Sequence, residues 1–220
     1  MIGPIAPQER LLFVGDSITD CGRRASAPPL GNGYVSLVAA AVAAMRPAPN
    51  LTILNRGISG DTTRDLLRRW QADVLAEAPD HLLIAIGIND VWRFMSRRFD
   101  EAVAVGEYEQ NLRHLLNLTT ETLPVCRIAL LEPFLVEAAN DDIFRRSLAS
   151  YQAVLRTLAA QFDLPLVGLQ GAFDAALAEG TAPGTLAGDR VHPTAAGHSL
   201  IARAFLAACR FELTPAEPHE

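Results

Sequence analysis

The sequence contains no lysine, because all 19 basic residues are arginine. A chain without an ε-amine cannot form the Schiff base of a pyridoxal enzyme, nor supply the lysine of a phosphate-binding P-loop. Long apolar runs are absent as well: the longest weakly polar stretch, residues 34–45, is shorter than the roughly 20 residues of a transmembrane helix. The first ten residues lack the cationic start and apolar core of a signal peptide. We therefore expect a cytoplasmic protein without a membrane segment.

Cysteine is scarce and badly placed for cross-linking. Cys21, Cys126 and Cys209 are odd in number, widely spaced and without a CxxC pair, so we expect reduced thiols rather than disulfides or a zinc site. Positive charge is also in deficit, with a net charge of −6 and a pI of about 5.4. Such a chain does not attract phosphate backbones or anionic lipids, so neither nucleic acid nor a membrane surface is expected as a partner.

The composition is that of a globular protein, with 50% hydrophobic and 20% charged residues in a chain of 220. This length favours one domain. We find no internal repeat, low-complexity tract or Gly/Ser-rich linker that would divide the chain. The sequence predicts a single domain over residues 1–220, with a core of about residues 11–210 and a frayed tail over residues 214–220.

Strand and helix patterns alternate along the chain. Apolar residues between 144 and 162 recur at the spacing of one helix face, and similar stripes occur at residues 108–116 and 200–208. Short strands that are apolar throughout indicate a parallel sheet covered on both faces. We therefore predict a three-layer α/β/α sandwich. Its five strands are expected at Leu11–Gly15, Leu51–Asn55, His81–Ile86, Cys126–Leu131 and Leu164–Leu169.

Polar segments follow the first three predicted strands, where ligands bind to open parallel sheets. They are residues 15–20, 55–61 and 87–90, and a fourth segment, Asp-Arg-Val-His, occupies residues 189–192. Acyl transfer needs a nucleophile, a base, a group that orients the base, and donors for the oxyanion. The four segments together offer one of each.

Ser17 is the candidate nucleophile, since it follows a short apolar strand on a sharp Gly-Asp turn. The alternative is that this serine only caps a helix or turn. His192 is the candidate base and Asp189, three residues earlier, the group that fixes its tautomer. A plain surface turn is the alternative for that pair. A metal site is disfavoured, because no second His or Cys lies at ligand spacing.

Gly60, through its backbone N–H, and Asn89, through its side-chain amide, are the candidate oxyanion donors beside the N–H of Ser17. A turn glycine and a structural loop amide are the alternatives. Ser59 is a decoy: residues 57–60 resemble a nucleophile elbow, but G-x-S-x-G needs one more residue before the second glycine.

The blocks around Ser17, Gly60, Asn89 and His192, in this order from residue 11 to about 209, resemble those of the SGNH or GDSL hydrolase family. The resemblance implies a flavodoxin-like fold, a Ser–His–Asp triad, no metal or other cofactor, and hydrolysis of esters or thioesters. In many members a glycine follows soon after the threonine of the first block, whereas residues 20–23 read Asp-Cys-Gly-Arg here.

That variant is most like the bacterial acetylxylan esterase branch, which implies an acetylated xylo-oligosaccharide as substrate and self-association into a homo-oligomer. Tyr34 and Trp92 are then candidates to stack on sugar faces, and Arg23, Arg64 or Arg93 to bond sugar hydroxyls. Two alternatives stay open. One is a lysophospholipase or thioesterase with the same triad; the other is a non-catalytic carbohydrate-binding or scaffolding protein.

Overall fold

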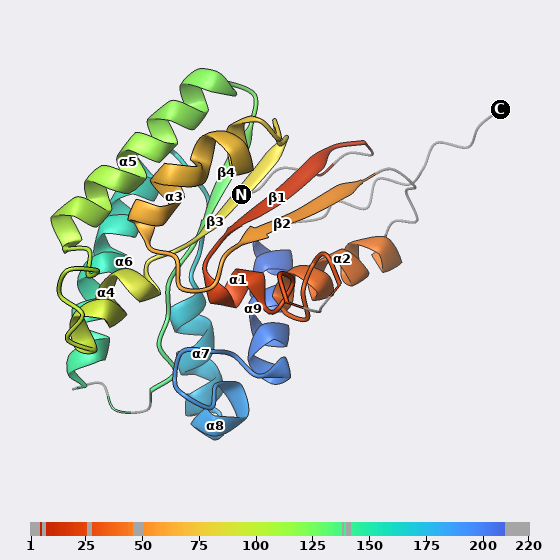
Figure 1. The fold of residues 1–220 in the computed structure, drawn as a ribbon. Coiled ribbons are helices and arrows are strands. Elements are labelled where there is room, and N and C mark those ends of the chain that lie inside the picture. Colours follow the sequence, from red (N-terminus) through yellow and green to blue (C-terminus); the bar gives the residue numbers. More distant parts are fainter. Residues whose placement is uncertain are drawn as a thin grey trace.

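A single five-stranded parallel sheet organises the molecule (Figure 1). The computed structural model describes residues 5, 8–25, 28–45, 51–137, 139 and 142–209. The strand order is β2-β1-β3-β4-β5, so the chain starts in the middle and adds strands first on one side and then on the other. The strands are β1 (Arg10–Gly15), β2 (Thr52–Gly57), β3 (His81–Ala85), β4 (Arg127–Leu131) and β5 (Leu166–Val167).

Helices cover both faces of the sheet, which confirms the predicted three-layer α/β/α sandwich (Figure 1). Helix α5 packs against α3 and α6 in one layer, and α2 packs against α9 in the other. The helices are α1 (Ser17–Asp20), α2 (Tyr34–Met45), α3 (Thr63–Trp70) with the π-helical turn η1 (Gln71–Leu75), α4 (Ile88–Met95), α5 (Val105–Thr122), α6 (Ile143–Gln161), α7 (Leu169–Ala178), α8 (Pro183–Leu186) and α9 (Ala195–Cys209).

Strand β1 lies inside the sheet, between β2 and β3, and its sequence is apolar without alternation. All four residues from Leu11 to Val14 are fully buried, because helices cover the sheet on both sides. The Phe13 ring meets the rings of Tyr34 from α2 and Phe205 from α9 edge to face, at centroid distances of 5.7 and 5.5 Å. These contacts tie one helical layer to the strand that leads into the candidate nucleophile.

Strand β5 is much shorter than predicted, two residues instead of the six at Leu164–Leu169. Pro165 has no N–H to donate to a ladder, and the backbone of Gly168 already starts helix α7. β5 pairs with β4 at Leu166 and Val167. Leu130 N also donates to the Pro165 carbonyl and Glu132 N to the Val167 carbonyl, at 2.9 and 3.0 Å. The apolar run alone did not reveal that its last residue, Leu169, already belongs to helix α7.

Helix α1 lies tightly against the end of β2 at Gly57. A Cβ on this glycine would stand 2.2 Å from the backbone nitrogen of Asp20. Only glycine permits such an approach. It brings the helix that begins with Ser17 close to the loop that follows β2.

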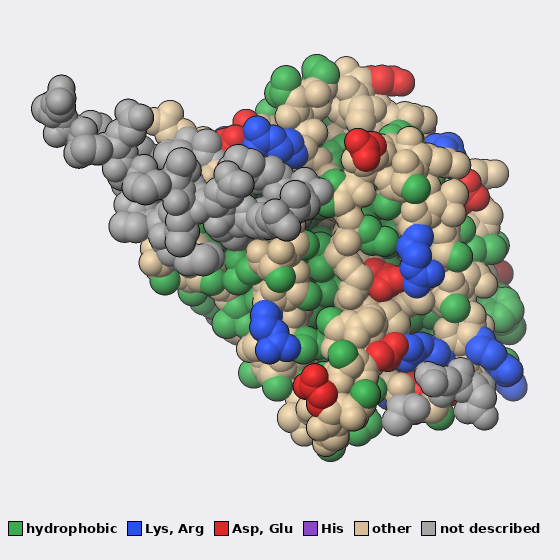
Figure 2. All heavy atoms as spheres, turned by 180° about the vertical axis from the view of Figure 1, so that it is seen from behind, with side chains coloured by type: hydrophobic (Ala, Val, Ile, Leu, Met, Phe, Trp, Pro, Cys, Tyr) green, Lys and Arg blue, Asp and Glu red, His purple; other side chains and the backbone are tan. Residues whose placement is uncertain are grey.

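The frayed tail predicted over residues 214–220 lies outside the described residues. In the described part of the chain, no helix is long and apolar enough to cross a membrane. Figure 2 shows arginine and acidic side chains interspersed over one face of the molecule, without a basic patch among the described residues there.

Candidate active site

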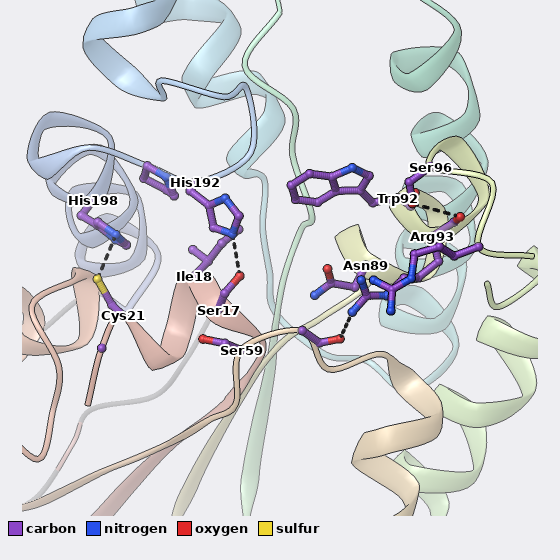
Figure 3. Close-up of a pocket in the computed structure, with 14 residues that line it drawn as sticks. Ser17, Ile18, Cys21, Ser59, Asn89, Trp92, Arg93, Ser96, His192 and His198 are labelled. Carbon is purple, nitrogen blue, oxygen red and sulfur yellow. Dashed lines mark hydrogen bonds between the residues drawn. The ribbon is translucent and has the colours of Figure 1, made fainter. Parts of the chain in front are cut away.

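Three predicted residues form a hydrogen-bonded chain at the carboxyl end of the sheet. The Ser17 hydroxyl lies 3.0 Å from His192 Nε2 (Figure 3), and His192 Nδ1 lies 2.6 Å from Asp189 Oδ2. A carboxylate can only accept, so Nδ1 carries the ring proton and Nε2 is left to accept from the serine. This is the tautomer in which a histidine can act as a base toward Ser17.

Ser17 is the first residue of α1, and Asp16 is the cap of that helix. Asp16 Oδ1 accepts from Ile18 N at 3.0 Å. Burial raises the pKa of Asp16 to about 7, against the lowering effect of this hydrogen bond. The carboxyl group next to the nucleophile therefore loses much of its charge near neutral pH, while it still fixes the turn that presents Ser17.

Asp189 behaves in the opposite way. Partial burial favours its neutral form, but hydrogen bonds from the His192 ring and from the backbone N–H groups of His192 and Val191 outweigh this and lower the pKa of Asp189. Of the two carboxyl groups, the one that contacts the histidine is thus the one that stays ionised. Active sites often contain two carboxyl groups whose environments shift their pKa values in opposite directions, so that each group can take a different role.

The loop after β2 forms a tight turn over Ile58–Asp61, here called the oxyanion turn. Asp61 N donates to the Ile58 carbonyl at 3.2 Å, Gly60 has φ of +88°, and Ser59 is not among the residues with positive φ. This combination defines a type II turn, whose third position favours glycine. Gly60 and Asn89 both line the same pocket as Ser17, so the predicted oxyanion donors share one cavity with the candidate nucleophile.

An open pocket of about 810 Å³ surrounds these groups. Trp92 forms part of its wall, with its ring centroid 5.6 Å from that of His192 (Figure 3). Arg93 and Ser96, from the end of α4, line the same side. The volume is within the range of small-molecule sites.

The expectation that Tyr34 stacks on a sugar face is wrong. Tyr34 is 1% exposed, and its hydroxyl bonds to Thr19 Oγ1 at 2.9 Å, so its ring cannot stack on a sugar. Arg23 and Arg64 are also engaged elsewhere: Arg23 donates to the Gly57 carbonyl and Arg64 pairs with Glu107.

Two helices frame the segment that carries Asp189 and His192. The helix α8 ends at Leu186, before this segment, and α9 begins at Ala195, after it. Pro193 lies before that helix and forms an isolated bridge with Ala187. Ser59 donates its hydroxyl hydrogen bond to Asp20 and not to a histidine, in line with the prediction that it is not the nucleophile.

A Cys21–His198 pair in the pocket wall was not foreseen from the sequence. His198 Nδ1 accepts from Tyr34 N at 3.2 Å, so its Nε2 carries the proton and faces Cys21 Sγ at 3.3 Å (Figure 3). The only sequence signal was the position of His198 one turn into the last helix. The neutral ring therefore serves to join α9 to the start of α2.

His198 gives a prediction for pH-dependent stability. Burial lowers the pKa of His198 from 6.5 to about 4, so the unfolded chain takes up a proton between these pH values and the folded protein does not. This contribution to stability is present above pH 6.5 and is lost as the pH falls toward 4. We expect the free energy of unfolding of wild type, relative to a His198→Asn variant, to drop by about 2–3 kcal/mol between pH 7 and 4.5.

The measurement is urea denaturation of both proteins at the two pH values. Other buried groups, such as Asp16, titrate in the same range in both proteins and cancel in the comparison. His114→Asn, at an exposed histidine of α5, is the control. A difference between wild type and His198→Asn that stays constant with pH would contradict the assignment.

Comparisons with known proteins show which family the sequence matches. The sequence profile of the GDSL-like lipase/acylhydrolase family matches residues 13–200. An acetylxylan esterase of Geobacillus stearothermophilus is 43% identical over 216 residues, which cover 94% of this chain and 97% of that protein.

Solved structures are similar over nearly the whole chain. The crystal structure of Axe2, an acetylxylan esterase from Geobacillus stearothermophilus, matches with a TM-score of 0.88 and 42% identity, over 97% of this chain and 99% of that one. Catalytic mutants of Axe2, with a serine, an aspartate or a histidine replaced by alanine, match with the same TM-score of 0.88. LAE5, an alpha/beta hydrolase enzyme from the metagenome of Lake Arreo in Spain, matches with a TM-score of 0.87 and 40% identity, over 94% and 97% of the two chains.

Proposed function

Since the chain belongs to the GDSL-like lipase/acylhydrolase family and is a carboxylic ester hydrolase, we propose that it removes O-acetyl groups from acetylated xylo-oligosaccharides. The observation that supports this activity most directly is the chain of hydrogen bonds from Ser17 through His192 to Asp189. The similarity to an acetylxylan esterase over nearly all of both chains supports the choice of substrate.

In the proposed first half-reaction, Ser17 Oγ attacks the acetyl carbonyl carbon while its proton passes to His192 Nε2. The carbonyl oxygen becomes an oxyanion, and the N–H groups of Ser17 and Gly60 and the Asn89 amide stabilise it. Asp189, ionised, stabilises the imidazolium that forms. His192 then gives the proton to the departing sugar oxygen as the C–O bond breaks, which leaves acetyl-Ser17.

In the second half-reaction, His192 takes a proton from water and the hydroxide attacks acetyl-Ser17. The same donors stabilise the second oxyanion, and its collapse releases acetic acid while His192 returns its proton to Ser17 Oγ. The acetic acid loses its proton to solvent and leaves as acetate. The amide of Asn89 has two N–H groups, and one of them donates to the Asp61 carbonyl at 3.0 Å. The other is left for the oxyanion.

The substrate can be tested against the lipid-esterase alternative by acyl-chain length. We expect acetate release from acetylated xylo-oligosaccharides, and faster cleavage of an aryl acetate than of the corresponding aryl decanoate. Cleavage of the aryl acetate without any acetate release from the oligosaccharide would support the esterase activity and contradict the proposed sugar substrate. A preference for the decanoate would favour the lysophospholipase or thioesterase alternative.

The non-catalytic alternative makes a separate prediction, since a binding or scaffolding protein would neither cleave an aryl ester nor react with a serine-directed phosphonate. The complete triad with its donors supports the enzyme instead. Cytoplasmic location, self-association and a single domain over residues 1–220 stay predictions from the sequence and its family resemblance.

A further inference from the structure

Two helices hold the oxyanion turn from opposite sides. On the side of α1, the carboxylate of Asp20 accepts from both the backbone N–H and the hydroxyl of Ser59, at 3.1 and 2.7 Å. Asp20 is 4% exposed and is the last residue of the helix that Ser17 begins. The peptide that contains the Gly60 N–H is therefore tied, through Ser59, to the helix of the nucleophile.

On the side of α4, two side chains hold consecutive carbonyl groups of the turn. Arg93 Nη2 donates to the Gly60 carbonyl at 2.9 Å (Figure 3), and Asn89 Nδ2 donates to the Asp61 carbonyl at 3.0 Å. Asn89 and Arg93 are four residues apart, so they lie on one face of the helix. A Cβ on Gly60 would stand 3.2 Å from Arg93 Nη2, so the guanidinium lies directly against the glycine.

A glycine needs such restraint if its N–H is to be a fixed donor. Gly60 can leave φ of +88° for many other conformations at little cost, because it has no side chain to limit rotation. Oxyanion donors are effective when they are already oriented before the charge develops. A hydrogen bond to the carbonyl of the same residue opposes rotation about both backbone bonds of Gly60.

We propose that Arg93 is a positioning residue that holds the Gly60 N–H toward the oxyanion, an inference that rests on the proposed serine esterase mechanism. This replaces the sequence-based expectation that Arg93 bonds sugar hydroxyls. Its Nη2 is engaged with the turn, its Nε faces Glu101 at 3.5 Å, and its side chain is 21% exposed. The guanidinium is thus held between protein groups on the wall of the pocket.

The test compares Arg93→Met with wild type on two substrates, an aryl acetate without sugar and an acetylated xylo-oligosaccharide. We expect kcat to fall about 10-fold on both, with KM changed less than about 2-fold. This loss is smaller than the 10²–10³ that removal of a donor costs, because the Gly60 N–H remains and only its orientation is relaxed. Arg98→Met is the matched control: Arg98 lines the same pocket and also pairs with Glu101, but donates to no carbonyl of the turn.

A positioning role and a sugar-binding role of Arg93 predict different results in this test. Loss only on the oligosaccharide, expressed in KM, would overturn the inference and make Arg93 a sugar contact; an unchanged kcat on the aryl acetate would overturn it as well. If Arg93→Met lowers the melting temperature strongly, Arg93→Lys carries the test, since one ammonium donor to the Gly60 carbonyl should restore part of kcat. A folded Arg93→Lys variant whose kcat is no higher than that of Arg93→Met would contradict the proposal. Inactive wild type on both substrates would instead refute the proposed function.

Discussion

Replacement of Ser17 by alanine should lower kcat for acetate release by about 10⁴–10⁶-fold. The reaction would lose the atom to which the acetyl group is transferred, whereas the oxyanion donors and the pocket would remain. KM should change little, because the hydroxyl makes only a small part of the substrate contact. The assay is acetate release from acetylated xylo-oligosaccharides, with an aryl acetate in parallel, at enzyme concentrations high enough to measure the residual rate.

Ser96→Ala is the matched control for this substitution. Ser96 is another hydroxyl in the same pocket, but its Oγ donates to the Trp92 carbonyl at 2.9 Å and meets no histidine. We expect less than about a 2-fold change in kcat. A Ser17→Ala protein that retains more than a few per cent of wild-type activity would show that another group is the nucleophile.

Replacement of Asp189 by asparagine should lower kcat by about 10⁴-fold near neutral pH. The substitution keeps the size of the side chain but places an amide N–H opposite His192 Nδ1, at a contact of 2.6 Å in wild type. The favoured tautomer then carries its proton on Nε2, where it cannot accept from Ser17, and no carboxylate stabilises the imidazolium. Proton NMR offers a direct readout, since the downfield signal of Nδ1–H should disappear.

A second carboxyl group serves as the control for Asp189→Asn. Asp163 is exposed and has φ of +52°, a conformation that asparagine tolerates well. Asp163→Asn removes the same charge far from the triad in sequence and should leave kcat unchanged. If Asp189→Asn lost less than about 10-fold, Asp189 would not be the group that orients His192.

The sequence predicted the sheet and the triad because both depend on short, local patterns. Continuous apolar runs follow from strands buried on both faces, and the polar residues that come directly after them must meet at one edge of a parallel sheet. This argument placed Ser17, Gly60 and Asn89 at one edge, and in the structure they line one pocket. The contact between Asp189 and His192 could be expected because only three positions separate them.

The features that the sequence did not predict are set by contacts between distant segments. Whether Tyr34 faces sugar or the core depends on the packing of α2 against Phe13, and an aromatic residue after a glycine-rich loop looks the same in both cases. Arg93 and Gly60 are 33 residues apart, and no local pattern marks their hydrogen bond. The length of β5 was missed for a related reason, since an apolar run does not say where a strand gives way to a helix.

The bond between Ser17 and His192 joins groups that are 175 positions apart, one directly after the first strand and the other after the last. During synthesis Ser17 leaves the ribosome long before His192. A growing chain can build β1, β2 and β3 around the serine and still lack any means to activate it. Loop-closure entropy also makes so distant a contact expensive to form early. Hydrolytic competence is therefore acquired late in folding, and intermediates that retain the first half of the sheet are catalytically silent.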